Sequence, residues 1–296
     1  MKRDDHVALL RRRLAARDLI VAPSCYDAIS ARIIHQAGFE VAFMSGFAVA
    51  AGRFGLPDNG LIGYAEMVET LRLICAANPD LAVFGDGDTG YGNPMNVRQT
   101  VIGYAQAGAS AVMIEDQLAP KRCGHMEGKT VVPIEEARMR IRAAADARRE
   151  SGLDIVIVAR TDANAPLGFD EAMRRLRAYR EEGADLLFLE APRDEAELAR
   201  FAREIDAPAM ANMVPGGKTP ILSPAKLRSL GFSLTLYHHA LFGAMEAMRT
   251  AHAALAAGDP EVGAPNMAFN DVKRIAGAET YAADERRYGL VEPIAT

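Results

Sequence analysis

Residues 170–189 read DEAMRRLRAYREEGADLLFL, a stretch that joins one helix pattern to one strand pattern. From Asp170 to Glu182, apolar residues recur every three or four positions behind an acidic start, which is typical of an amphipathic helix. Gly183 supplies the helix stop, and Leu186–Leu189 is apolar at every position. A short run without polar alternation indicates a parallel strand covered on both faces. The stretch therefore predicts one helix–strand unit of an α/β protein.

The same unit recurs along the whole chain. Helix-like segments separate eight short apolar runs, which cover residues 19–23, 41–44, 81–84, 111–114, 155–158, 186–189, 208–211 and 234–237. Eight strand–helix alternations without a break in composition favour one closed (β/α)₈ barrel, the TIM-barrel fold. An open doubly wound sheet is the alternative, but such a sheet usually has fewer strands.

The domain organisation follows from the positions of these runs. We expect residues 1–296 to form a single barrel domain, with a leading helix at 4–16, the barrel at 19–257 and a C-terminal helical tail at 258–296. Gly258-Asp259-Pro260 marks the start of the tail. The tail is too small for a domain of its own, so we expect it to pack on the barrel or on a neighbouring subunit.

Composition limits the classes of function. The 296 residues are 50% hydrophobic and 25% charged, with a net charge of −5, which argues against nucleic-acid or anionic-membrane partners. No segment approaches the ~20 apolar residues that cross a bilayer, and the N-terminus lacks a signal-peptide pattern. The three cysteines show no C-x-x-C spacing, which predicts free thiols in a reducing compartment. The expected location is cytoplasmic.

Polar residues follow every apolar run, where a (β/α)₈ barrel carries its active site. They are Ser24-Cys25-Tyr26-Asp27, Ser45-Gly46-Phe47, Asp86-Gly87-Asp88, Glu115-Asp116, Arg160-Thr161-Asp162, Glu190, Asn212 and His238-His239. Ordinary helix caps and turns account individually for Ser24, Asp116 and Asp162. They do not account for Arg160 and Glu190, which are charged and directly follow buried runs.

Three of these residues indicate a metal site. Asp86 and Asp88 end the third run, and Glu115 ends the neighbouring one. Converging carboxylates without a nearby cation would repel one another, and a metal ion would remove that repulsion. Their hard oxygen atoms suit Mg²⁺, with Mn²⁺ as the other candidate. An acidic turn without a metal is the alternative.

Two loops carry further candidates. Lys121-Arg122-Cys123-Gly124-His125 places a thiol between cations and an imidazole, surroundings that lower a thiol pKa and favour proton transfer. An exposed polar loop with an incidental cysteine is almost as good an explanation. The segment from Pro215 to Pro220 follows the seventh run and contains Gly216-Gly217-Lys218. It could bind an anion through backbone amides or be a plain surface loop.

Together these motifs resemble the isocitrate lyase/phosphoenolpyruvate mutase superfamily over residues 20–247. The resemblance rests on Tyr26-Asp27, Ser45-Gly46, Gly55-Leu56-Pro57-Asp58, Asp86-Gly87-Asp88-Thr89-Gly90-Tyr91-Gly92, Glu115-Asp116-Gln117, Lys121-Arg122-Cys123-Gly124-His125, Arg160-Thr161-Asp162 and Asn212-Met213. The branch of interest contains 2-methylisocitrate lyases, dimethylmalate lyases, oxaloacetate decarboxylases and carboxyphosphonoenolpyruvate phosphonomutases.

The resemblance implies a role for each candidate. Mg²⁺ would be held, directly or through water, by Asp58, Asp86, Asp88 and Glu115. A 2-oxo or 2-hydroxy acid would contact Ser45, Gly46, Phe47, Arg160, Glu190, Asn212 and His239. The catalytic group would comprise Cys123, Lys121, His125 and Tyr26, with Cys123 protonating the carbanion product. A homotetramer that exchanges the last barrel helix between subunits is implied as well.

The leading hypothesis is a Mg²⁺-dependent carbon–carbon lyase. It would cleave a small 2-hydroxy dicarboxylic acid of the malate, citramalate or dimethylmalate type, by retro-aldol chemistry, to a 2-oxo acid and a carboxylate. Three alternatives stay open: an oxaloacetate decarboxylase giving pyruvate and CO₂, a carboxyphosphonoenolpyruvate-type phosphonomutase, and a non-enzymatic assembly or sensing module.

Overall fold

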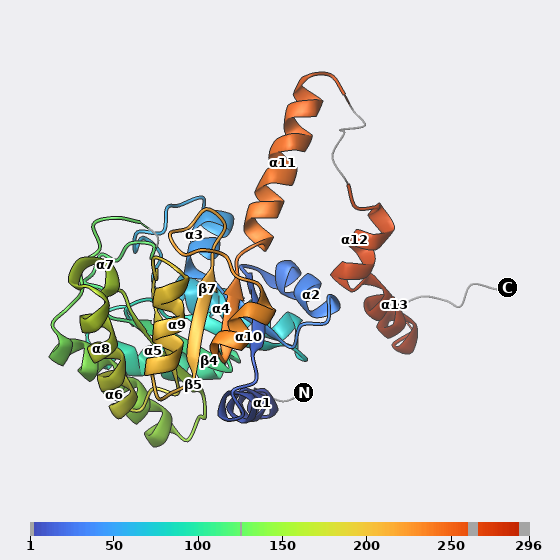
Figure 1. Cartoon of the computed structure of the whole chain (residues 1–296). Helices are drawn as coiled ribbons and strands as arrows, with labels where there is room; N and C mark the ends of the chain where they lie inside the picture. The colour runs from blue at the N-terminus through green and yellow to red at the C-terminus, as the bar shows by residue number, and fades with distance from the viewer. Residues whose placement is uncertain (1–2, 125, 260–265, 290–296) are drawn as a thin grey trace. The chain divides into compact units, whose positions relative to one another are not determined.

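Eight parallel strands close into a barrel in sequential order (Figure 1). The structure is a computed structural model and describes residues 3–124, 126–259 and 266–289. The strands are β1 (Ile20–Cys25), β2 (Val41–Met44), β3 (Ala82–Asp86), β4 (Ala111–Glu115), β5 (Val156–Thr161), β6 (Leu186–Leu189), β7 (Ala209–Met213) and β8 (Leu234–Tyr237). The predicted (β/α)₈ barrel is confirmed, because β8 pairs with β1 and leaves no open sheet.

Helices precede, connect and follow the strands. They are α1 (Arg3–Ala15), α2 (Ala28–Gln36), α3 (Gly46–Phe54), α4 (Tyr64–Ala77), α5 (Pro94–Ala107), α6 (Ile134–Ser151), α7 (Asn164–Leu167), α8 (Phe169–Glu181), α9 (Glu195–Glu204), α10 (Pro224–Leu230), α11 (Ala240–Ala256), α12 (Phe269–Ala276) and α13 (Ala278–Arg287). The stretch 170–189 forms α8 and β6, and Gly183 between them has a φ of 106°, which suits glycine. Within the described ranges, every helix is too short or too polar to traverse a bilayer.

The chain divides into two compact units after Leu241. The first unit contains α1, the eight strands and the helices from α2 to α10. The second contains most of α11 together with α12 and α13, and α12 ends at Gly277 in a left-handed conformation (φ 93°). The single-domain organisation, the exchange of the last barrel helix and the homotetramer stay predictions.

Helix α1 closes the N-terminal end of the barrel. Val7, Leu10 and Leu14 are buried in one cluster with the inward-facing strand residues. Arg11 on the same helix donates hydrogen bonds to Asp154 (2.9 Å) and Asp185 (3.0 Å), which lie just before β5 and β6. The helix therefore acts as an apolar plug that ion pairs hold in place.

Truncating this plug should destabilise the barrel. Leu10 is 1% exposed, so Leu10→Ala removes buried methyl groups and should lower the free energy of unfolding by about 2–5 kcal/mol. Urea unfolding followed by circular dichroism measures the change. Leu9→Ala on the same helix is the matched control, because Leu9 is only partly buried and should cost less. Equal costs for the two variants would contradict the plugging role of Leu10.

The barrel interior changes from apolar to polar towards the C-terminal ends of the strands. Its apolar level is formed by Phe43, Phe84, Met113, Val158, Phe188, Met210 and Leu236. Side chains alternate along a strand, so the residue two positions later points inward as well. These later residues, which we call the polar layer, are Ser45, Asp86, Glu115, Arg160, Glu190, Asn212 and His238. The fold thus places a ring of polar side chains directly above an apolar floor.

Candidate functional site

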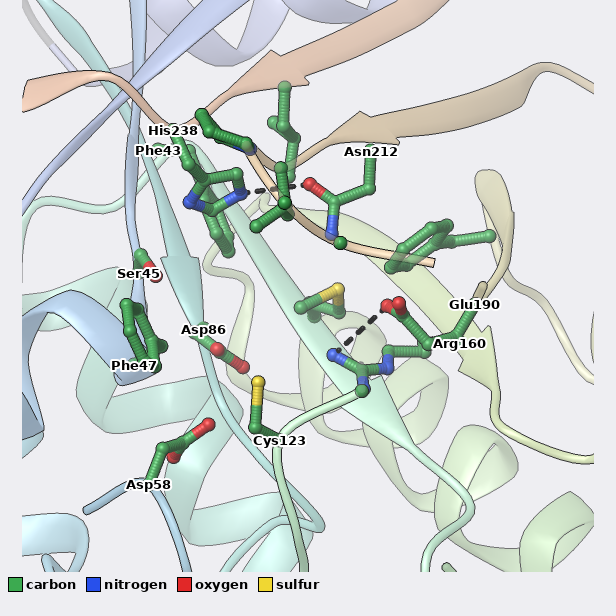
Figure 2. A pocket seen from close by; sticks show the side chains of 18 residues that line it. Phe43, Ser45, Phe47, Asp58, Asp86, Cys123, Arg160, Glu190, Asn212 and His238 are labelled. Atoms are coloured by element: carbon green, nitrogen blue, oxygen red, sulfur yellow. Dashed lines mark hydrogen bonds and ion pairs between the residues drawn. The ribbon is translucent and has the colours of Figure 1, made fainter. Parts of the chain in front are cut away.

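A cavity of about 210 Å³ lies above the apolar floor (Figure 2). The polar layer contributes Ser45, Asp86, Arg160, Glu190, Asn212 and His238, and the floor contributes Phe43, Met113, Phe188 and Leu236. Helix α3 contributes Phe47, and loops contribute Asp58, Cys123, Gly124, Val214, Pro215, Gly216 and Gly217. Most residues that were predicted from the sequence to bind substrate, bind metal or transfer a proton therefore line or adjoin one cavity.

Backbone amides hold Asp86 in place within the carboxylate cluster, a name we give to the four predicted metal ligands Asp58, Asp86, Asp88 and Glu115. It ends β3, and its two carboxylate oxygens accept hydrogen bonds from the backbone amides of Gly46 (3.1 Å) and Asp88 (3.2 Å). Ser45 caps α3, so the N-terminus of that helix lies beside Asp86. A side chain at position 46 would place its Cβ 2.9 Å from the Asp86 carboxylate, which explains the glycine.

Two cations of the chain reach the cluster. The ammonium group of Lys121 hydrogen-bonds to Asp58 and lies 2.8 Å from an oxygen of Asp88. The guanidinium group of Arg160 lies 3.3 Å from Glu115. The carboxylates therefore have cations beside them, which offset part of their mutual repulsion. Among the described residues, no three His, Cys, Asp or Glu side chains are arranged to share one metal ion, and Lys121 lies between two of the predicted ligands.

The four carboxylates nevertheless outnumber the two cations beside them. Burial raises the pKa values of Asp86, Asp88 and Glu115, and the opposing effects of Lys121 and Arg160 do not cancel that rise. One carboxylate oxygen of Glu115 is buried and accepts no hydrogen bond from the described residues. A divalent cation would restore the ionised forms, and the four carboxylates are the hard oxygen donors that Mg²⁺ prefers. The donor atoms present therefore suit that ion in their chemistry, while in this structure Lys121 pairs with two of the carboxylates.

Arg160 occupies the opposite wall of the cavity. It bonds to both oxygens of Asp162 (2.8 and 3.0 Å), and it lies 3.5 Å from Glu190 (Figure 2). Burial alone would raise the pKa of Asp162, but Arg160 and Lys129 lower it to about 2. The two cations therefore favour the ionised form of Asp162, and its two hydrogen bonds fix the direction of the Arg160 side chain.

Asp116 supports this wall from behind. Its carboxylate accepts hydrogen bonds from the Thr161 hydroxyl (2.6 Å), the Asp162 amide (2.8 Å), Tyr179 (2.7 Å) and Arg175 (3.1 Å). The sequence indicated only turn residues at Asp116 and Asp162, whereas both are buried links between strands. One sequence pattern could have indicated this site: Arg175 and Tyr179 are four positions apart, so they share one face of α8 and can bond to the same carboxylate.

Cys123 lies in the same cavity. Its backbone amide donates to the Asp58 carbonyl (3.1 Å), and Figure 2 shows its thiol between Asp86 and Arg160. Tyr26 does not line the cavity, because its ring packs beside Gly52 on α3. His125 lies outside the described residues. Of the predicted catalytic group, the structure therefore places Cys123 in the cavity and Lys121 beside it.

The histidine prediction requires a correction. His239 is exposed and stacks on Tyr237 with ring centroids 5.8 Å apart, so it lies outside the cavity lining. His238 lines the cavity, and its Nε2 lies 2.8 Å from the Asn212 side-chain oxygen. Alternation along β8 is the reason, since Leu236 faces the interior and the inward position after it is 238. The structure therefore places His238, and not His239, in the cavity lining.

The barrel and its polar layer define a class of enzyme. The family model described as phosphoenolpyruvate phosphomutase matches residues 10–256, and the chain belongs to this family. It is an enzyme of the phosphoenolpyruvate mutase/isocitrate lyase superfamily, of the lyase or mutase type. The resemblance inferred from the sequence is confirmed.

Individual relatives cover most of the chain. It is 39% identical to 2,3-dimethylmalate lyase of Eubacterium barkeri over 95% of this chain and 97% of that one. It is 40% identical to 2-methylisocitrate lyase of Bacillus subtilis over 77% of this chain and 73% of that one.

Solved structures agree with these relatives. A 2,3-dimethylmalate lyase is similar with a TM-score of 0.91 and 36% identity, covering 96% of this chain and 95% of that one. Oxaloacetate acetylhydrolase in complex with 3,3-difluorooxalacetate is similar with a TM-score of 0.92 and 33% identity, covering 96% of this chain and 97% of that one. Phosphonopyruvate hydrolase in complex with oxalate and Mg²⁺ is similar with a TM-score of 0.84 and 30% identity, covering 97% of this chain and 99% of that one.

Proposed function

We propose that the chain is a Mg²⁺-dependent carbon–carbon lyase for a small 2-hydroxy dicarboxylic acid of the malate, citramalate or dimethylmalate type. The observation that carries the proposal is one cavity in which Cys123 lies between the carboxylate cluster and Arg160, above an apolar floor. The similarity to 2,3-dimethylmalate lyase over 95% of the chain supports the same reaction class.

Asp58, Asp86, Asp88 and Glu115 would hold the metal ion. When bound, Mg²⁺ supplies the Lewis acidity that lowers the pKa of a 2-hydroxyl group. The complex of phosphonopyruvate hydrolase with oxalate and Mg²⁺ gives a precedent in a relative with 30% identity. Because Lys121 bonds to Asp58 and Asp88, its ammonium group would have to withdraw from them when they bind the ion.

Other side chains of the cavity would bind the substrate and transfer the proton. Arg160 presents a fixed guanidinium group that attracts a substrate carboxylate, and Asn212 and His238 supply hydrogen bonds on the neighbouring wall. As the 2-hydroxyl gives its proton to a carboxylate of the site, C2 becomes a carbonyl, the C2–C3 bond breaks and its electron pair remains on C3. The Cys123 thiol then gives its proton to C3, and the proton held by the carboxylate restores the thiol. The floor of Phe43, Met113, Phe188 and Leu236 would exclude water and accept alkyl groups on C3.

A substrate panel tests the proposal. The protein with Mg²⁺ is incubated with malate, citramalate, 2,3-dimethylmalate, oxaloacetate and phosphonopyruvate, and 2-oxo acid formation is followed by coupled reduction. We expect cleavage of at least one 2-hydroxy acid, with a carboxylate as the second product in proton NMR. Carbon dioxide from oxaloacetate as the only activity would replace the proposal with a decarboxylase. Turnover of the phosphonate alone, followed by phosphorus NMR, would replace it with phosphonate chemistry.

Removing a metal carboxylate should weaken Mg²⁺ binding before any chemistry occurs. Asp86→Asn removes a charge at the centre of the cluster and should raise the Kd for Mg²⁺, measured by calorimetry, by at least ~10–100-fold. Asp170→Asn is the matched control, because Asp170 is exposed and lies at the start of α8, outside the cavity lining. An Asp86→Asn protein that binds Mg²⁺ like the control would contradict the assignment of these ligands.

A further inference from the structure

The loop that carries Cys123 is tied at its base. It leaves the barrel at Gln117 and returns at Val131, and these two residues form an antiparallel bridge. The Gln117 side chain binds the backbone of Arg122 twice, as donor to its carbonyl (2.8 Å) and as acceptor from its amide (3.0 Å). These bonds fix the loop as far as Arg122. The positions of Cys123 and Gly124 therefore depend also on contacts made by the second half of the loop.

Lys129 provides that second attachment. Its ammonium group donates to the Gly124 carbonyl (2.5 Å) and to Asp162 (2.7 Å), and only 2% of the side chain is exposed. Burying an ammonium group costs several kcal/mol unless it is paired and hydrogen-bonded. Lys129 therefore links the Cys123 loop to Asp162, which directly follows β5.

The carboxylate that receives Lys129 is the one that orients Arg160. Asp162 is fully buried, binds Arg160 through both oxygens, and is held through its amide by Asp116. The same anion thus fixes a substrate-facing guanidinium group and anchors the loop of the proposed proton donor. A displacement of Asp162 would therefore move both the Arg160 guanidinium group and the Cys123 loop.

Gly124 brings the loop into direct contact with the cavity wall. A Cβ atom at this position would lie 2.6 Å from an Arg160 nitrogen and 2.6 Å from a Glu190 oxygen. Such distances leave no space for a side chain, so the backbone at Gly124 rests on the Arg160–Glu190 pair. The adjacent Cys123 is thereby aimed into the cavity.

We propose that Lys129 is a positioning residue that fastens the Cys123 loop to Asp162, so that the thiol and the Arg160 guanidinium group are held by one shared carboxylate. This role deepens the proposed lyase function and rests on it for its catalytic consequence. The geometric part, that Lys129 fixes the position of Cys123, does not depend on the reaction.

Lys129→Met tests the role, since methionine has similar length and no donor. We expect iodoacetamide to alkylate Cys123 several-fold faster in this variant, as measured by mass spectrometry of the tryptic peptides, with Cys25 and Cys75 unchanged. On the substrate found by the panel, kcat should fall by about 10²-fold, the usual cost of a displacement near 1 Å, while KM changes little. Lys129→Arg keeps a charged donor and should recover part of both properties.

Two further variants make the result decisive. Lys226→Met is the matched control, because Lys226 forms an exposed pair with Glu195 and should alter neither Cys123 alkylation nor kcat. Gly124→Ala keeps Lys129 but adds a Cβ atom that would clash with the Arg160–Glu190 pair, so it should displace the same loop and also accelerate alkylation. Unchanged alkylation in folded Lys129→Met and Gly124→Ala proteins would overturn the inference. If alkylation rises but no 2-hydroxy acid is cleaved by the wild-type enzyme, the attachment stands and the lyase proposal fails.

Discussion

Cys123→Ser should lower kcat for cleavage of the 2-hydroxy acid by about 10²–10⁴-fold, the usual contribution of a positioned general acid. The reason is the location of the thiol between Asp86 and Arg160, where the carbanion of the departing fragment would form. Serine is nearly isosteric but a far weaker acid, so it occupies the site without readily donating a proton. Steady-state kinetics gives kcat, and calorimetry should show that Mg²⁺ affinity is retained.

Cys75→Ser is the matched control for this experiment. Cys75 lies on α4 outside the cavity lining, and burial raises the pKa of its thiol to about 12. Its replacement should therefore leave kcat and the Kd for Mg²⁺ unchanged. A fully active Cys123→Ser enzyme would show that the proton comes from another donor.

The barrel could be predicted because its decisive signal is local. Three of the eight apolar runs, at 41–44, 186–189 and 234–237, match β2, β6 and β8 at both ends. Other strands extend further towards the C-terminus, and β3 and β4 end at Asp86 and Glu115. The apolar residues of a strand end at the floor of the cavity, whereas the backbone hydrogen bonds between strands continue into the polar layer. The sequence pattern therefore indicated strand identity better than strand length.

The polar layer was only partly predictable. Asp86, Glu115 and Arg160 are inward positions on strands, and counting by two from the apolar floor leads to each of them. The same count selects His238, but the prediction relied on resemblance and selected His239. Side-chain alternation is thus a better guide to the inward histidine than similarity of a neighbouring motif.

The ion pairs around the site could not be predicted from spacing. Lys121 reaches Asp58 and Asp88, which lie 63 and 33 positions earlier in the chain, and Lys129 reaches Asp162, 33 positions later. These pairings depend on the path of the loop from Gln117 to Val131, which no periodicity specifies. The sequence showed a surplus of carboxylates, and only the fold revealed which cations offset part of it.

Arg160→Met should have the largest effect on stability. Arg160 is buried among Glu115, Asp162 and Glu190, and removing one partner of a buried ion pair costs about 3–5 kcal/mol because the remaining charge is uncompensated. The variant should also bind the 2-hydroxy acid more weakly, since it lacks the cation facing the substrate. Urea unfolding at neutral pH measures the loss of stability.

The pH dependence of that loss identifies its cause. Burial already raises the folded-state pKa of Glu115 above its unfolded value, and Arg160 opposes the rise. Without Arg160 the folded pKa of Glu115 rises further, so the folded variant retains protons that the unfolded chain releases as pH rises above roughly 4.3. The stability deficit relative to wild type should therefore be larger at pH 8 than at pH 5. Arg160→Lys keeps the charge without the bidentate geometry and should show a smaller deficit with a weaker pH dependence. Equal deficits at both pH values would mean that Arg160 stabilises the barrel through packing on Phe188 rather than through its charge.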